Sequence, residues 1–124
     1  MALEYRIDFE GSVIEVRVTG IPDRESTAQM WSDIVAACAR HECLYILGIS
    51  NIDKPQKVAD AIYHQAIFLQ AGVTIDHRIA WVQLNPDAVE MTRLAETVLL
   101  NRGMVNGRLF TDENEARRWL RGDP

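Results

Sequence analysis

The segment from Cys43 to Asp53, CLYILGISNID, decides the fold. It contains the most continuous apolar run in the chain, is rich in β-branched and aromatic residues, and ends abruptly in polar and turn-forming residues. This composition is typical of a strand that is buried on both faces inside a parallel sheet. Because the segments on both sides have helical spacing, we predict a central strand here, with its carboxyl end opening into a polar loop.

The residues before this strand predict a hairpin and a helix. Apolar and polar residues alternate over residues 5–10 and 14–19, and Gly11 lies between the two runs. Alternation on both sides of a glycine-containing turn predicts two half-buried strands that pair as a β-hairpin. A helix should follow, beginning near Ser26 with Gln29 in the spacing of a capping box, or one turn earlier with Asp23 as its cap.

The residues after the central strand alternate between helical and strand patterns. We predict, in order, a helix from about Pro55 to Gly72 capped by Asp53, a buried strand from His77 to Leu84, a helix from Asn85 to Gly103, a strand from Arg108 to Phe110, and a last helix capped by Thr111 or Asp112. This order describes one α/β domain over residues 1–124, in which an N-terminal β-hairpin precedes βα units and the central sheet is mainly parallel.

Composition limits the classes of function. A chain of 124 residues that is 48% hydrophobic can bury a core without disulfides or a metal. Cys38 and Cys43 do not form a secreted disulfide pattern, and no segment is apolar for long enough to be a membrane span or a signal sequence. We therefore expect a soluble, cytoplasmic protein. The net charge of -5 argues against a nucleic-acid-binding domain, which usually gathers basic residues on one face.

Several segments resemble those of the STAS domains, the family of the anti-sigma-factor antagonists (SpoIIAA-like proteins). They are the leading hairpin, the central strand LYILGISN over residues 44–51, the strand RIAWV over residues 78–82, and the closing segment RLFTDENEARRWL over residues 108–120. The resemblance covers nearly the whole chain. It implies a SpoIIAA-like (STAS) fold and a regulatory role without catalysis.

Regulation in the STAS family depends on a serine or threonine that a kinase phosphorylates, in an Asp-Ser-Ser-Gly-like loop at the start of the helix after the central strand. Here the loop reads SNIDKPQK over residues 50–57, without a hydroxyl at the helix start or a glycine behind it. Ser50 is the nearest hydroxyl but belongs to the strand end, and Lys54 and Pro55 occupy the acceptor positions. We therefore predict that the scaffold is retained and that Ser50 is not a regulatory phosphosite.

No arrangement of residues indicates catalysis, a metal or a cofactor. His41, His64 and His77 are widely separated in the sequence, and the two cysteines fall on elements that should face the core. There is no Gly-x-Ser-x-Gly elbow and no glycine-rich phosphate loop, since Gly48 stands alone within its strand. We predict no catalytic residue, no metal site and no cofactor.

The carboxyl ends of the strands form the predicted binding edge, because ligands of parallel α/β sheets bind there. The candidate binding residues at this edge are Ser50, Asn51, Asp53, Lys54 and Lys57. Caps and turns account for most such residue types, but not for two cations at a helix start. Lys54 and Lys57 therefore indicate an anion held against the free backbone N–H groups of the second helix.

The second helix carries more apolar surface than a sheet-facing helix requires. We assign one stripe of side chains to its own sheet: Val58, Ile62, Ala66 and Leu69. Tyr63 and Ile67 lie to one side of that stripe and Phe68 to the other. A contiguous apolar patch often marks an interface, so we predict a homodimer with Tyr63, Ile67 and Phe68 at its two-fold contact. The alternative is that the hairpin or the last helix covers this side within one chain.

Together these features predict a non-catalytic regulatory or protein-interaction module on a STAS-like scaffold, with a protein partner and no binding to nucleic acid or membrane. Two alternatives stay open. One is a carrier of an apolar or lipid-like molecule held under the second helix. The other is an enzyme that uses the carboxyl-terminal edge of the sheet, which a buried cleft with convergent polar groups would favour.

Overall fold

The alternating strand and helix patterns form the elements that they predict, in the predicted order. The computed structural model describes residues 2–122. Its strands are β1 (Glu4–Glu10), β2 (Val13–Gly20), β3 (Tyr45–Ile52), β4 (Arg78–Gln83) and β5 (Asn106–Phe110). Its helices are α1 (Arg24–His41), α2 (Val58–Ala71), α3 (Val89–Asn101) and α4 (Glu113–Leu120), and a short 3-10 helix, η1 (Pro86–Ala88), leads into α3.

The strands form one sheet in the order β1-β2-β3-β4-β5. β1 and β2 pair as the antiparallel hairpin, and every later pair is parallel. β3 therefore lies in the middle of the sheet, which confirms the fold predicted from the segment around it. In this register Gly48 of β3 lies opposite Trp81 of β4.

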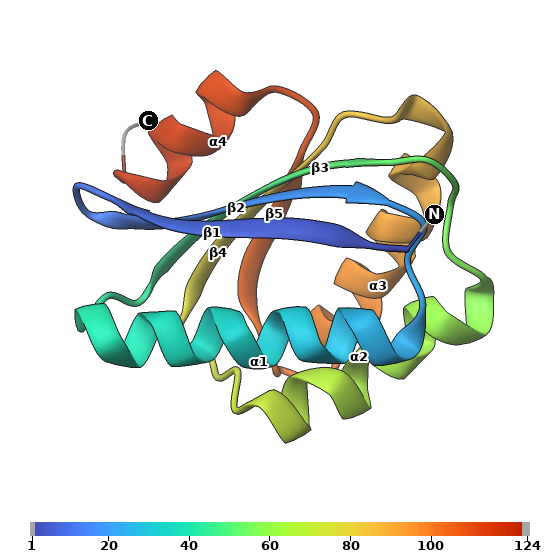
Figure 1. The fold of residues 1–124 in the computed structure, drawn as a ribbon, viewed down its shortest axis with the longest axis horizontal. Coiled ribbons are helices and arrows are strands. Elements are labelled where there is room, and N and C mark those ends of the chain that lie inside the picture. The colour runs from blue at the N-terminus through green and yellow to red at the C-terminus, as the bar shows by residue number, and fades with distance from the viewer. Residues whose placement is uncertain (1, 123–124) are drawn as a thin grey trace.

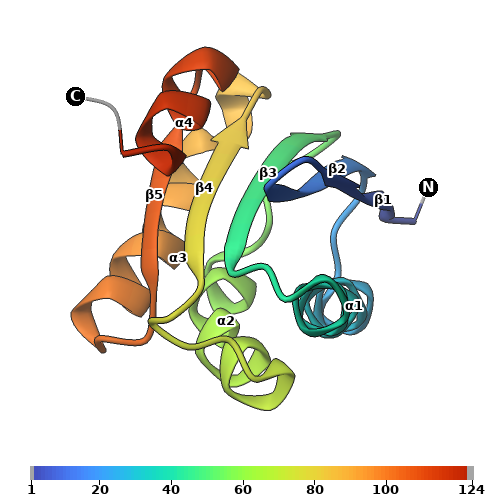
Figure 2. The same cartoon turned by 90° about the vertical axis from the view of Figure 1, so that its left-hand side faces the viewer.

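Three helices cover one face of the sheet and one covers the other. Figures 1 and 2 show α1, α2 and α3 on one side and α4 on the opposite side. Alternate residues of the strands divide accordingly, with Ile46 packing under the three helices and Leu47 under α4. α2 makes its main contacts with α1 and α3, and fewer with the strands. This placement of α2 leaves room between the helix and the sheet.

The second, smaller core lies under α4, and charged groups add to it. Ala116 and Leu120 pack on the sheet, and the mostly buried Glu15 of β2 accepts from Nη2 of Arg117 at 3.1 Å. Arg78 Nη2 donates to the Trp119 carbonyl at 2.6 Å, and its guanidinium lies 3.7 Å from the centre of the Trp119 ring. These contacts fix α4 against β2 and β4.

The structure chooses between the two predicted starts of α1 and moves the start of α2. Asp23 accepts from the Ser26 backbone N–H at 2.7 Å, so α1 begins at the earlier of the two predicted caps. α2 begins at Val58 instead of Pro55, and Asp53 does not cap it. The Asp53 N–H instead donates to the Gly20 carbonyl at 2.8 Å, which ties this residue to the end of the sheet. The intervening loop is therefore longer than we expected.

Within residues 2–122, no helix combines the length and apolar character that crossing a membrane requires.

Candidate functional site

The five residues predicted to bind at the sheet edge do not form one cluster. Ser50 is a buried residue of β3, with 2% of its surface exposed. Asn51 is exposed, and strand alternation turns it to the opposite face of the sheet. Asp53, Lys54 and Lys57 are exposed in the loop before α2. The structure thus separates Ser50 from the loop residues with which we grouped it.

The two loop lysines lie at the start of α2 without partners. Neither Lys54 nor Lys57 forms an ion pair with another residue of the described range. Lys57 is the residue before the helix, and its side chain makes no capping bond. Asp60 supplies a negative charge in the first turn and pairs with Arg24 of α1. An anion held by the lysines stays a prediction.

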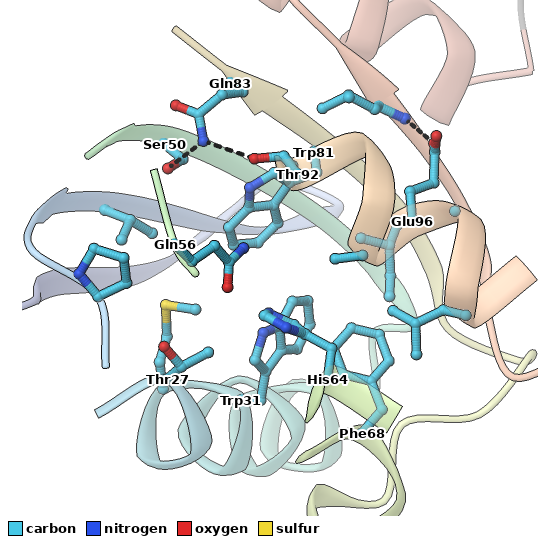
Figure 3. A pocket seen from close by; sticks show the side chains of 18 of the residues that line it. Thr27, Trp31, Ser50, Gln56, His64, Phe68, Trp81, Gln83, Thr92 and Glu96 are labelled. Carbon is cyan, nitrogen blue, oxygen red and sulfur yellow. Dashed lines mark hydrogen bonds between the residues drawn. The ribbon is translucent and has the colours of Figure 1, made fainter. Parts of the chain in front are cut away.

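A cavity lies beneath α2, between the helices and the sheet (Figure 3). We name it the Trp pocket, because Trp31 of α1 and Trp81 of β4 form its walls together with Phe68 of α2. Its cavity volume is about 110 Å³, and the cavity is partly open to solvent. Ser50 and Gln83 lie on its side toward the carboxyl ends of β3 and β4. The pocket therefore occupies the place under α2 that the ligand-carrier alternative requires.

The aromatic walls depend on one glycine. The rings of Trp31 and Phe68 are 4.5 Å apart between centroids, and those of Trp31 and Trp81 are 5.3 Å apart. A Cβ atom at Gly48 would lie 2.0 Å from Cε3 of Trp81, so the indole can lie across β3 because residue 48 has no side chain. Gly48 therefore shapes the floor of the pocket.

A network of neutral side chains closes the pocket at the strand ends. Gln83 Nε2 donates to Ser50 Oγ at 3.2 Å and to Thr92 Oγ1 at 3.2 Å, as Figure 3 shows. Its carbonyl oxygen accepts from the Asn85 N–H at 3.2 Å, so the whole Gln83 amide is engaged. The network joins β3, β4 and α3, and it gives the Ser50 hydroxyl a structural role. Ser50 is 2% exposed; that it is not a phosphosite stays a prediction.

Four polar groups of the pocket lack a partner among residues 2–122. They are the hydroxyl of Thr27, the indole N–H groups of Trp31 and Trp81, and the side-chain amide of Gln56. Thr27 is 7% exposed and Trp31 is 3% exposed. Figure 3 shows the Gln56 amide reaching into the middle of the pocket, toward Thr27 and His64. No fully buried side-chain N or O atom of residues 2–122 lacks a hydrogen-bond partner, so these polar atoms are accessible within the pocket. They are free to bond a polar atom of a molecule that enters it.

His64 of α2 adds a neutral acceptor to the pocket. Its Nδ1 lies 3.0 Å from the Asp60 carbonyl, which can accept but not donate, so we place the imidazole proton on Nδ1 and the lone pair on Nε2. Burial lowers the pKa of the His64 imidazole and favours the uncharged ring. The sequence did not identify this role, since one histidine on an apolar helix face is usually part of a core.

Arg24 lines a smaller hollow beside the Trp pocket, and the two share Thr27, Gln56 and His64. The Arg24 guanidinium pairs with Asp60 and lies 4.3 Å from the centre of the Tyr63 ring. Arg24 therefore holds the first turns of α1 and α2 together next to the Gln56 loop.

The assignment of faces on α2 was wrong. Ile67 and Phe68, which we placed on an outer surface, are 2% and 3% exposed and belong to the main core. Tyr63 is half-buried under Arg24. The stripe that we assigned to the sheet faces solvent instead: Val58 is 53% exposed, Ile62 45% and Leu69 74%. Both stripes are apolar, and the contact between the tilted rings of Phe68 and Trp31 selects the inner one. Tyr63, Ile67 and Phe68 therefore have no exposed patch to offer a partner.

The cysteines and histidines of residues 2–122 do not gather into a metal-binding group. Cys38 and Cys43 are both buried free thiols. Burial raises the pKa of the Cys38 thiol to about 11, so it is protonated at neutral pH and a poor nucleophile.

The sequence indicated the position of the pocket but not its residues. Trp81 and Gln83 occur in a segment whose sequence predicts a fully buried strand. Gln56 occurs in the loop that we compared with the phosphorylation loop of the STAS family. One signal was present: the isolated Gly48 in the central strand suggests that a large neighbour approaches the backbone closely. The identity of that neighbour depends on the register between β3 and β4.

Comparison with known proteins gives a fold. No protein-family model matches this sequence, and no curated protein matches it either. Among solved structures, the chain is similar to an anti-sigma factor antagonist from Mycobacterium paratuberculosis, with a TM-score of 0.63 and 14% sequence identity over 96% of this chain and 94% of the other. This protein therefore has the STAS, or SpoIIAA-like, fold of that anti-sigma factor antagonist.

Proposed function

We propose that this chain is a non-catalytic regulatory module that binds a small, mainly apolar molecule in the Trp pocket. The observation that carries the proposal is the pocket itself, in which aromatic walls surround accessible polar groups that have no hydrogen-bond partner within residues 2–122. Ligand sites in proteins have this character, with apolar walls and a few polar groups that orient the ligand. Support for a regulatory role without catalysis comes from the fold that the chain shares with an anti-sigma factor antagonist.

The loop between β3 and α2 supplies a means of regulation. Gln56 reaches from this loop into the pocket, while its neighbours Lys54 and Lys57 are exposed on the surface. A ligand that engages Gln56 would hold the loop in one position and so change what the surface presents. In this proposal, occupancy of the pocket takes the place of phosphorylation at the loop.

Blocking the pocket tests the proposal. The uncharged dye N-phenyl-1-naphthylamine, which fluoresces strongly in apolar sites, should bind the wild type saturably at one site per chain. Ala95→Phe should abolish this signal, because Ala95 lines the pocket and is 6% exposed. Thr97→Phe is the matched control, since Thr97 is an exposed residue of the same helix. Equal dye binding by both variants would contradict the proposal.

A second candidate function is binding to a protein partner through the outer surface of α2. The exposed stripe of Val58, Ile62 and Leu69 supports it, because contiguous apolar surface often marks an interface. The first partner to test is a second copy of the chain, since a helix can pair with itself about a two-fold axis. The homodimer that we predicted is thus retained as a proposal, on the opposite face of the helix.

A further inference from the structure

We propose that the molecule held in the Trp pocket is uncharged and carries a hydroxyl or amide group on an apolar body. The inference rests on the proposed ligand-binding function and specifies the class of ligand. It excludes fatty acids, phosphate esters and other anions.

No cationic side chain is placed to receive an anion. No lysine lines the pocket, and Arg108 is the one arginine among its lining residues in the described range. The Arg108 guanidinium lies 5.4 Å from the centre of the Phe110 ring. Phe110 packs in the core under α4, so this guanidinium lies on the opposite face of the sheet. Arg24, in the smaller hollow beside the pocket, is already paired with Asp60.

The remaining ionisable groups also disfavour an anion. Glu96 is an acid, and its Oε2 accepts the N–H of Leu109 at the outer edge of β5. Figure 3 shows the Glu96 carboxylate turned toward that strand and away from the middle of the pocket. His64 presents a lone pair at Nε2, because its Nδ1–H is bonded to Asp60. A carboxylate or phosphate here would lose its hydration without gaining a countercharge.

Neutral polar groups, in contrast, are available in the pocket as both hydrogen-bond donors and acceptors. The Gln56 amide and the Thr27 hydroxyl can each donate and accept, and the Trp31 indole can donate. None of the three has a hydrogen-bond partner within residues 2–122. Gln56 and Thr27 both line the pocket, and Figure 3 shows Thr27 on the α1 side and the Gln56 amide nearer the middle. A hydroxyl or amide between them would donate to one group and accept from another, while its apolar part lay along Trp31 and Phe68.

Three probes with the same ten-carbon chain test the class of ligand: 1-decanol, decanoate at pH 8 and decyl methyl ether. Binding is measured by titration calorimetry below the aggregation limit of each probe. We expect 1-decanol to bind with the highest affinity. Decanoate should bind at least about tenfold more weakly, because its charge is desolvated without a partner. The ether should bind about fivefold more weakly, because it cannot donate a hydrogen bond.

Substitution of Gln56 tests whether its amide makes the hydrogen bond to the ligand. Gln56→Leu should weaken 1-decanol about fivefold and leave the ether nearly unchanged. Gln70→Leu, at an exposed position of α2, should change neither. Decanoate binding as tightly as 1-decanol, or equal losses for alcohol and ether in Gln56→Leu, would overturn the inference. In either case, the proposed function still stands if binding of the probes is lost in Ala95→Phe and kept in Thr97→Phe. Probe binding that Ala95→Phe leaves intact would overturn both.

Discussion

At the scale of the residue, the Trp pocket depends on side chains whose neighbours decide their role. Gly48 is an isolated glycine in the sequence, and the structure places the Trp81 indole directly over it. His64 lies on an apolar helix face, and its bond to the Asp60 carbonyl fixes its tautomer. Neither role follows from composition or spacing, because each depends on a partner on another turn or strand.

Gly48→Ala should destabilise the protein by about 1–3 kcal/mol, the usual cost of overfilling a packed site. The added methyl group would meet Trp81 at 2.0 Å and push the indole away from the sheet. Urea unfolding measures the loss. The same substitution in a Trp81→Leu background should cost much less, because leucine leaves the space above residue 48 free. An equal cost in both backgrounds would show that the indole is not the obstacle.

His64 should make the stability of the protein depend on pH in the mildly acidic range. Its pKa in the folded protein is lowered from the ordinary value of 6.5, so the unfolded chain takes up the proton first as the pH falls. Stability is therefore lost as the pH falls below about 6.5 toward the folded-state pKa. Unfolding at pH 7.5 and pH 5.5 should show a smaller loss in His64→Gln than in the wild type. His41→Gln, at an exposed position, should behave like the wild type; matching losses in all three proteins would refute this role for His64.

At the scale of the element, the four α-helices and five strands of the described residues could be predicted, while the inner face of α2 and its start could not. Alternation and caps identify β1, β2 and α4 because those signals are local. α2 has two apolar stripes, and periodicity alone cannot decide which one meets the core. The contact between Phe68 and Trp31 decides it, and that contact joins residues 37 positions apart. The start of α2 was missed because Asp53 bonds to β2 and is unavailable as a cap.

The outer stripe of α2 should drive association of the wild-type chain into a dimer at micromolar concentrations. Ile62→Glu/Leu69→Glu should yield a monomer, because both side chains are exposed in the single chain and charges there would oppose burial at an interface. Light scattering gives the mass, and circular dichroism checks that the variant is folded. Gln70 is an exposed polar residue of the same helix, so Gln70→Glu serves as a control of charge alone. A monomeric wild type would exclude the dimer.

At the scale of the whole molecule, the hairpin followed by alternating helices and strands was enough to predict the mainly parallel sheet and its helical cover. The pocket was not predictable in the same way. It exists because α2 packs on α1 and α3 more than on the strands, and this spacing depends on the bulk of side chains from seven elements. The predicted site therefore lies near the correct strand ends, but most of the residues that we named for it are exposed in the loop. Gln56 of the same loop, which we did not name, points into the pocket.

The three tryptophans of the chain permit a direct test of the claim that the Trp pocket is a ligand site. Trp31 and Trp81 line the pocket, whereas Trp119 lies on α4 at the opposite face of the sheet. The indole N–H signals of all three can be followed by ¹⁵N–¹H nuclear magnetic resonance during titration with 1-decanol. We predict that the Trp31 and Trp81 signals shift together to saturation while the Trp119 signal stays in place. Unchanged signals at Trp31 and Trp81, or an equal shift of all three, would contradict the account.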